Sequence, residues 1–165
     1  DAALYYIAFQ IGSIVLIIPD AMSTSFFVEG SHGTNLRKGV ASTLAVTYAI
    51  LLPAVALLVI FGDRFLALFG NAYVAAFSLL QVIAVSSVFV TIYLIFIPLQ
   101  NIRLRVNGIV VMNLIRFILL IGLSYFLLRR FGMIGAGYAW ACTYLILGIG
   151  IFIFERKFRP DKDKY

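Results

Sequence analysis

Five apolar runs dominate this sequence, and each is long enough to cross a membrane as a helix. The runs cover residues 2–28, 40–61, 73–99, 109–128 and 134–154. An α-helix needs about 20 apolar residues to span roughly 30 Å of hydrocarbon, and inside lipid only helices and closed barrels satisfy their own backbone hydrogen bonds. The sequence therefore predicts an all-α, polytopic membrane bundle of about five transmembrane helices over residues 1–154, followed by a basic tail at 155–165.

Composition excludes a water-soluble globular domain. Of the 165 residues, 63% are hydrophobic and only 12% are charged, and the mean hydropathy is +1.06. A soluble chain of this size buries only about 70% of its unfolded surface, and these residues include too few polar side chains to cover the rest. The chain starts at Asp1 without a signal-peptide pattern, so we expect upstream sequence to be missing.

The connections between the runs are short and rich in glycine, which predicts that successive helices are antiparallel neighbours. These connections cover residues 29–39, 62–72, 100–108 and 129–133. Pro19 and Pro53 lie inside apolar runs, where membrane helices tolerate proline, and they predict kinks rather than helix ends.

Charge placement predicts the orientation in the cell membrane, because short cytoplasmic loops retain Lys and Arg. Nine cations fall on one side of the predicted bundle: Arg37, Lys38, Arg103, Arg105, Arg156, Lys157, Arg159, Lys162 and Lys164. Only Arg64, Arg129 and Arg130 fall on the other side. This bias predicts a multi-pass protein whose C-terminus is cytoplasmic and whose first helix enters the membrane from outside. The net charge of +6 is then mainly a topology signal, and we expect lipid headgroups rather than nucleic acid as its partner.

Motifs for catalysis and cofactor binding are missing from the sequence. There is no phosphate-binding loop, nucleophile elbow or metal-ligand cluster, and His32 and Cys142 are the only residues of their types. We therefore expect neither an enzyme nor a bound metal or cofactor, and Cys142 is interpreted as a packing residue. Gly135, Ala139 and Thr143 recur every four residues and predict a small-residue stripe for close helix packing.

Two charges lie within the apolar runs, Asp20 and Arg116. An ionisable side chain at the bilayer centre costs upwards of about 2.5 kcal/mol and usually faces a partner or a cavity. At about 1.5 Å per residue, both lie roughly 12–13 Å from their presumed cytoplasmic helix ends. They could form a buried ion pair; alternatively, Arg116 could bind a phosphate or pyrophosphate in a polar cavity, or Asp20 could be a coupling carboxylate for cations or protons.

Other polar residues lie near the same cytoplasmic ends. Asn113 lies in the fourth run, Gln100 and Asn101 lie at the end of the third, and the first connection contains Glu29, His32 and Asn35. These side chains could line the mouth of an inward-facing cavity, or they could simply cap helices and contact the membrane interface.

Four stretches of the sequence resemble the polysaccharide flippases of the MATE-like multidrug/oligosaccharidyl-lipid/polysaccharide exporter superfamily, which include O-antigen translocases. They are "YYIAFQIGSIVLIIPDAMSTSFFVEGS" (5–31), "FGDRFLALFGNAYVAAFSLL" (61–80), "RLRVNGIVVMN" (103–113) and "FGMIGAGYAWA" (131–141). The first differs from many members in lacking a second proline near its end. The resemblance implies that the chain is most of a C-terminal lobe that lacks its first helix and works with a missing N-terminal lobe.

The function implied by the resemblance is rocker-switch movement of a polyprenyl-linked oligosaccharide or polysaccharide precursor across the membrane, without covalent chemistry. In this interpretation Arg116 and Asn113 contact the anionic head, and Arg37, Lys38, Arg103 and Arg105 recruit its phosphates. Two alternatives remain open. A cation-coupled multidrug exporter would use Asp20, and a non-transporting anchor or the membrane part of a glycosyltransferase would use none of these residues for transport.

Overall fold

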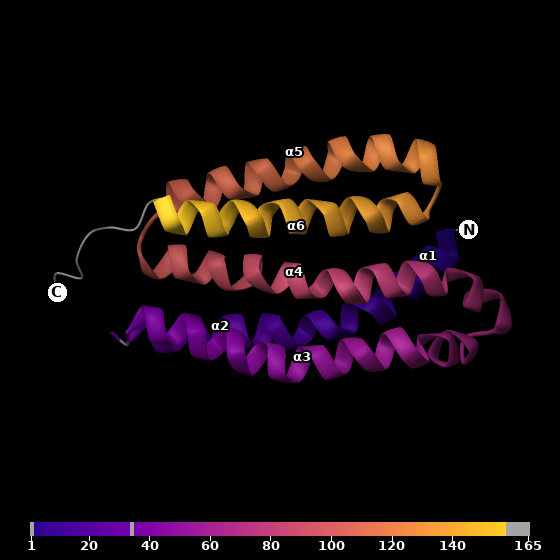
Figure 1. Ribbon diagram of the computed structural model, residues 1–165, viewed down its shortest axis with the longest axis horizontal. Coiled ribbons are helices and arrows are strands. Elements are labelled where there is room, and N and C mark those ends of the chain that lie inside the picture. The colour runs from indigo at the N-terminus through magenta and orange to yellow at the C-terminus, as the bar shows by residue number, and fades with distance from the viewer. Residues whose placement is uncertain (1, 34, 158–165) are drawn as a thin grey trace.

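The chain folds as a bundle of long helices, described here by a computed structural model for residues 2–33 and 35–157 (Figure 1). Helix accounts for 93% of it, and no strand occurs in these ranges. The elements are α1 (Ala2–Ser13), the 3₁₀ segment η1 (Ile14–Leu16), α2 (Ile17–Ser31), α3 (Leu36–Ala67), the 3₁₀ segment η2 (Asn71–Ala76), α4 (Phe77–Ile102), α5 (Val106–Phe131) and α6 (Ile134–Lys157). Five helical stretches are long and apolar enough to span a membrane, which confirms the predicted fold class.

The helices extend beyond the apolar runs at most of their ends. Helix α3 begins at Leu36 instead of residue 40 and continues to Ala67 instead of 61. Backbone hydrogen bonding does not stop where the hydrocarbon ends, and long cationic side chains can reach the interface from the last turns of a helix. The side chain of Asn35 caps α3 by accepting a hydrogen bond from the Lys38 backbone N–H at 3.2 Å.

The first membrane span is interrupted before Pro19. Because proline has no N–H, the carbonyl of Val15 cannot receive the usual hydrogen bond from four residues later. The chain tightens there into the 3₁₀ segment η1, whereas α3 continues without a break through Pro53. The two prolines therefore differ in their effect on helix continuity.

Helix α4 is the centre of the bundle and packs against α1, α2, α3 and α6. In Figure 1 it lies between α6 and the pair formed by α2 and α3, with α5 at one edge. In the apolar part of each span, 61% of the residues are buried for the span that contains α4, compared with 17% for α3 and 6% for α5. The outer helices therefore present most of their surface to the surrounding solvent, which for a chain of this composition is lipid.

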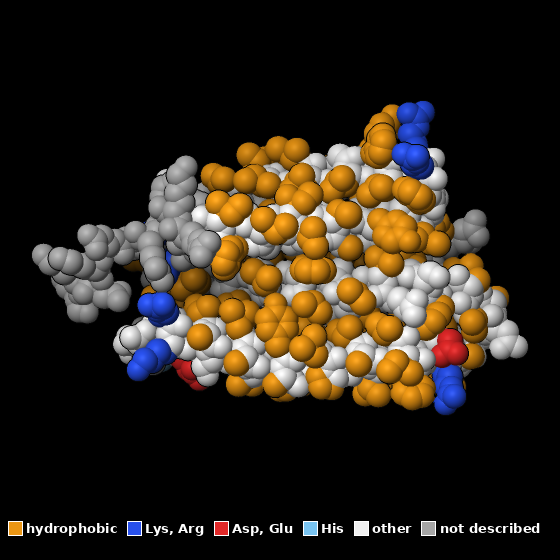
Figure 2. Space-filling model, viewed as in Figure 1, with side chains coloured by type: hydrophobic (Ala, Val, Ile, Leu, Met, Phe, Trp, Pro, Cys, Tyr) orange, Lys and Arg blue, Asp and Glu red, His pale blue; other side chains and the backbone are white. Residues whose placement is uncertain are grey.

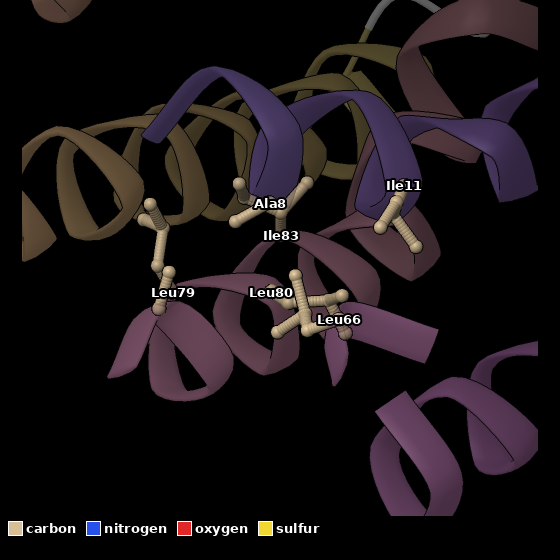
Figure 3. Close-up of a cluster of buried hydrophobic side chains, with 7 residues drawn as sticks. Ala8, Ile11, Leu66, Leu79, Leu80 and Ile83 are labelled. Atoms are coloured by element: carbon tan, nitrogen blue, oxygen red, sulfur yellow. The ribbon is translucent and has the colours of Figure 1, made fainter. Parts of the chain in front are cut away.

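Glycines from four neighbouring helices face α4. A Cβ atom added to Gly12, Gly30, Gly62 or Gly137 would come within 2.5–2.9 Å of a side chain of that helix. Close by lies a cluster of buried apolar side chains, most of them labelled in Figure 3: Ala8, Ile11, Leu66, Ala76, Leu79, Leu80 and Ile83. Small residues at such positions let helix backbones approach in lipid, where association depends on van der Waals contact.

The predicted small-residue stripe of α6 is confirmed. Gly135, Ala139 and Thr143 are all buried, and a Cβ atom on Gly135 would overlap the backbone carbonyl of Leu127 in α5. The α5–α6 hairpin is therefore closed by direct contact with the α5 backbone.

Apart from Asp20 and Arg116, the charged side chains of the described residues lie toward the two ends of the bundle. Figure 2 shows an uncharged middle zone on the visible face, with Lys, Arg, Asp and Glu near its ends. We call the end that holds the α2–α3 and α4–α5 turns the basic end, and the end that holds the α3–α4 and α5–α6 turns the opposite end. The predicted tail cations Arg159, Lys162 and Lys164 lie outside the described residues.

Replacing Gly135 with alanine should destabilise the bundle, because the added methyl group meets backbone atoms that cannot rotate away. Overpacking of this kind typically costs about 1–3 kcal/mol. We expect a lower midpoint of thermal unfolding in detergent for Gly135→Ala. The control is Gly150→Ala on the same helix, where nothing lies within 4 Å of the added atom; equal midpoints for the two variants would contradict the close contact.

Candidate functional site

Arg116 lies on the face of α5 that is turned toward α4 and α6, and its side chain is half-buried. The guanidinium carbon is 5.3 Å from the ring centroid of Tyr93 on α4, and the guanidinium also interacts with the hydroxyl of Tyr144 on α6. A cation above an aromatic face is stabilised by the quadrupole of the ring, more strongly where water is excluded. Arg116 is thus held by aromatic side chains from two neighbouring helices.

Asn113 completes this arrangement one turn away on α5. Its side-chain Oδ1 accepts a hydrogen bond from the Tyr93 hydroxyl at 2.8 Å, and its Nδ2 donates to the Ile109 carbonyl at 3.1 Å. The rings of Tyr93 and Tyr144 meet edge to face, with centroids 5.6 Å apart. We call Arg116, Asn113, Tyr93 and Tyr144 the arginine cluster.

The arginine cluster leaves donors available for a ligand. A guanidinium has five N–H donors in a planar fork. Contact with the face of the Tyr93 ring occupies none of them, and the Tyr144 hydroxyl engages only part of the fork. The Tyr93 hydroxyl, in contrast, is already engaged with Asn113. The chemistry offered to a ligand is therefore mainly that of a positioned cation, which suits a phosphate or carboxylate.

Aromatic packing continues from the arginine cluster to the first helix. Tyr144 contacts Trp140, Trp140 contacts Phe9 of α1, and Phe9 stacks on Tyr5, with ring centroids 5.0, 5.7 and 5.9 Å apart. Bulky rings in series restrict each other's rotamers. This packing therefore fixes the position of Tyr144 beside the arginine.

The expected ion pair between Asp20 and Arg116 is not formed. Asp20 is exposed on α2, whereas Arg116 points toward α4 and α6. Figure 1 places α2 and α5 on opposite sides of α4, and these two helices share no substantial contact. Two residues at similar depth can face different sides of a bundle, so the ion-pair alternative is wrong.

The other predicted site residues gather at the basic end, away from the arginine cluster. Arg37 and Lys38 are exposed in the first turn of α3, Arg105 is exposed at the N-cap of α5, and Arg103 is half-buried. Arg105 and Arg116 are separated by 11 residues, or about 16 Å along α5. The predicted substrate-binding set thus divides into a mid-membrane group and an end group.

The turn between α4 and α5 brings Arg103 and Arg105 together around Leu104. Leu104 has a φ of 54°, its N–H donates to the Asn101 carbonyl at 3.0 Å, and the Arg105 N–H donates to the Gln100 carbonyl at 2.9 Å. This is a Schellman motif, which usually has glycine at the left-handed position. Leu104 is 86% exposed, and beside it lies an open hollow of about 400 Å³ lined by Gln100, Leu104, Arg105, Val106, Asn107 and Gly108.

Sequence reasoning missed Tyr93 and Tyr144. Both are aromatic residues with a polar tip inside apolar runs, and this combination was the available signal. Their relation to Arg116 depends on how α4, α5 and α6 are rotated about their axes, which the sequence does not reveal. Within residues 2–33 and 35–157, no group of His, Cys, Asp or Glu is arranged to hold a metal ion.

A double-mutant cycle on Asp20→Asn and Arg116→Gln should give additive changes in the free energy of unfolding, to within about 0.5 kcal/mol. Breaking a buried ion pair would instead couple the two sites by several kcal/mol. The cycle on Tyr93→Phe and Asn113→Ala gives the scale of a single direct hydrogen bond in a membrane bundle, about 0.6 kcal/mol, which is far below the coupling of an ion pair. A large coupling between Asp20 and Arg116 would contradict their separation.

Comparison with known proteins adds no relative: no family model, curated protein or solved structure matches this chain. The flippase resemblance stays a prediction, and the evidence that bears on function is the chemistry of the described side chains. Of these, the arginine cluster is the most specific arrangement.

Proposed function

We propose that this chain is part of a membrane transporter that moves a lipid-linked oligosaccharide or polysaccharide precursor across the cell membrane. The observation that carries the proposal is the guanidinium of Arg116, which lies about 15 Å from the start of α5 and is held by Tyr93 and Tyr144 instead of a carboxylate. Keeping a charge at this depth costs upwards of about 2.5 kcal/mol. Binding of an anionic ligand by Arg116 would offset this cost and would explain why a charge is placed at this depth.

The pyrophosphate that joins a sugar head to its carrier lipid has the chemistry that Arg116 would recognise. Two N–H groups of one guanidinium can contact two phosphate oxygens at once, and such charge-assisted hydrogen bonds are about twice as strong as neutral ones. Asn113 lies beside the arginine and orients Tyr93 through the 2.8 Å hydrogen bond. In this proposal Arg116 binds the head group, and Asn113 and Tyr93 keep the arginine in place.

The basic end supports the same proposal from the membrane surface. Arg37, Lys38, Arg103 and Arg105 surround the turns at that end, and three of them are exposed. Cations near a membrane surface attract anionic headgroups by about 1 kcal/mol each. In this proposal the basic end faces the cytoplasm and collects the phosphate head before transport, together with the N-terminal lobe that the resemblance implies.

A second candidate function is favoured by the exposed carboxylate of Asp20. No cation of the described chain pairs with it, so it could bind an organic cation or a coupling ion. A cation-coupled multidrug exporter would use this residue rather than Arg116. The two candidates therefore depend on different residues on opposite sides of α4.

Replacing Arg116 with alanine should reduce oligosaccharide-lipid transport by at least tenfold at matched abundance, since hydrogen bonds to charged groups contribute about 1.5–3 kcal/mol. The measurement is flux or complementation by the full-length protein. Arg130→Ala, at the opposite end, is the control and should retain transport. Normal oligosaccharide flux in Arg116→Ala would refute the proposal, and loss of organic-cation efflux in Asp20→Asn would then favour the exporter.

Thiol labelling in intact cells tests the orientation. In a Cys142→Ala background, a membrane-impermeant maleimide should label Arg130→Cys from outside and should label Lys38→Cys only after permeabilisation. The bias of Lys and Arg toward the basic end is the reason for this expectation. The reverse pattern of labelling would place the basic end outside the cell and remove its role in recruitment.

A further inference from the structure

One side of the first membrane span carries a series of polar residues that we call the α1–α2 stripe: Tyr6, Gln10, Ser13, Asp20 and Thr24. They follow one another at intervals of four, three, seven and four residues, which places them on one side of a helix. Four of the five are exposed, and Ser13 is half-buried. The stripe therefore extends along most of the span on the surface of the chain.

The exposed surfaces of α3 and α5 are different at the same depth. On α3 the large exposed residues in the middle of the span are Val46, Ile50, Leu52, Leu57 and Ile60, and on α5 they are Val110, Val111, Leu114, Ile115, Phe117, Ile118 and Ile121. All are apolar, as expected for helices that face lipid. The α1–α2 stripe is the polar exception.

Hydrocarbon is an unfavourable environment for this stripe. Its hydroxyl and amide groups are partly satisfied locally, because Ser13 donates to the Gln10 carbonyl, Thr24 donates to the Asp20 carbonyl and the Gln10 amide donates to the Tyr6 hydroxyl. The Asp20 carboxylate has no hydrogen-bond or ion-pair partner among the described residues. An aspartate at the centre of a helix in lipid costs about 2.5–3.5 kcal/mol.

Close helix packing does not explain the stripe either. The two glycines by which this span approaches another helix, Gly12 and Gly30, are turned toward Ile83 and Ile102 of α4. On the stripe side, Ile17 projects from the surface and is 67% exposed. The stripe thus lies on the side of the span that is turned away from its helix-packing contacts.

We propose that the α1–α2 stripe lines a water-filled path through the membrane, and that Asp20 meets this water about 17 Å from the basic end of α2. Water satisfies the carboxylate and removes its desolvation cost. The inference rests on the proposed transport function, because a transporter needs a path by which a polar substrate crosses the membrane. Hydroxyl, amide and carboxylate side chains are also suitable hydrogen-bond partners for a passing sugar head.

Reaction with a charged, water-soluble methanethiosulfonate tests the inference in native membranes that contain the full-length Cys142→Ala protein. Ile17→Cys and Thr24→Cys lie on the stripe side. Ile50→Cys on α3 is the matched control, because Ile50 is as many residues from the start of α3 as Ile17 is from the end of α2 and its side chain is 51% exposed. Thiols react as thiolates, which form in water and not in hydrocarbon, so we expect at least tenfold faster labelling at positions 17 and 24 than at 50.

A labelling-rate ratio below tenfold, relative to position 50, at both positions 17 and 24 would overturn the water-filled path. A photoreactive amino acid at position 17 would then show whether lipid or protein covers the stripe. Labelling does not depend on the substrate, so fast labelling together with unchanged oligosaccharide flux in Arg116→Ala would refute the proposed function and leave the path standing. The conservative Thr24→Cys variant keeps the test valid if Ile17→Cys fails to accumulate.

Discussion

Close contact between helices at glycine positions is the constraint on which this bundle depends. In lipid the hydrophobic effect does not drive apolar helices together, so they associate through van der Waals contact over short distances. Gly12, Gly30, Gly62 and Gly137 provide such contacts to α4 from α1, α2, α3 and α6, and Gly135 provides one between α6 and α5. These contacts determine which surface of each helix is left for lipid, water or another protein.

The two mid-membrane charges occupy different environments because α4 separates them. Arg116 is half-buried among aromatic side chains of α4 and α6, which stabilise a cation without neutralising it. Asp20 lies on the α2 surface with its carboxylate exposed. In the proposed transporter, the cation on one side of α4 and the exposed carboxylate on the other would serve different steps, namely binding of the head group and coupling to an ion.

The sequence was sufficient to predict the five spans, because 20-residue apolar runs and short turns leave few alternatives in a membrane. It was less informative about helix ends, since hydrogen bonding continues past the apolar residues, as at Leu36 and Ala67 of α3. The Gly135 stripe was predictable from its four-residue spacing. The depths of Asp20 and Arg116 also followed from residue counts, but their partners did not, because rotation and lateral position depend on packing around α4.

The central position of α4 has a consequence for biogenesis. Membrane helices leave the insertion machinery in the order of synthesis, so the first span and α3 enter the bilayer before the helix that buries Gly12, Gly30 and Gly62. Until α4 is inserted, those glycines lack the helix that they contact in the folded bundle. Assembly of this half of the bundle therefore waits for the third span, and the α5–α6 hairpin, with its own contact at Gly135, can form and dock afterwards.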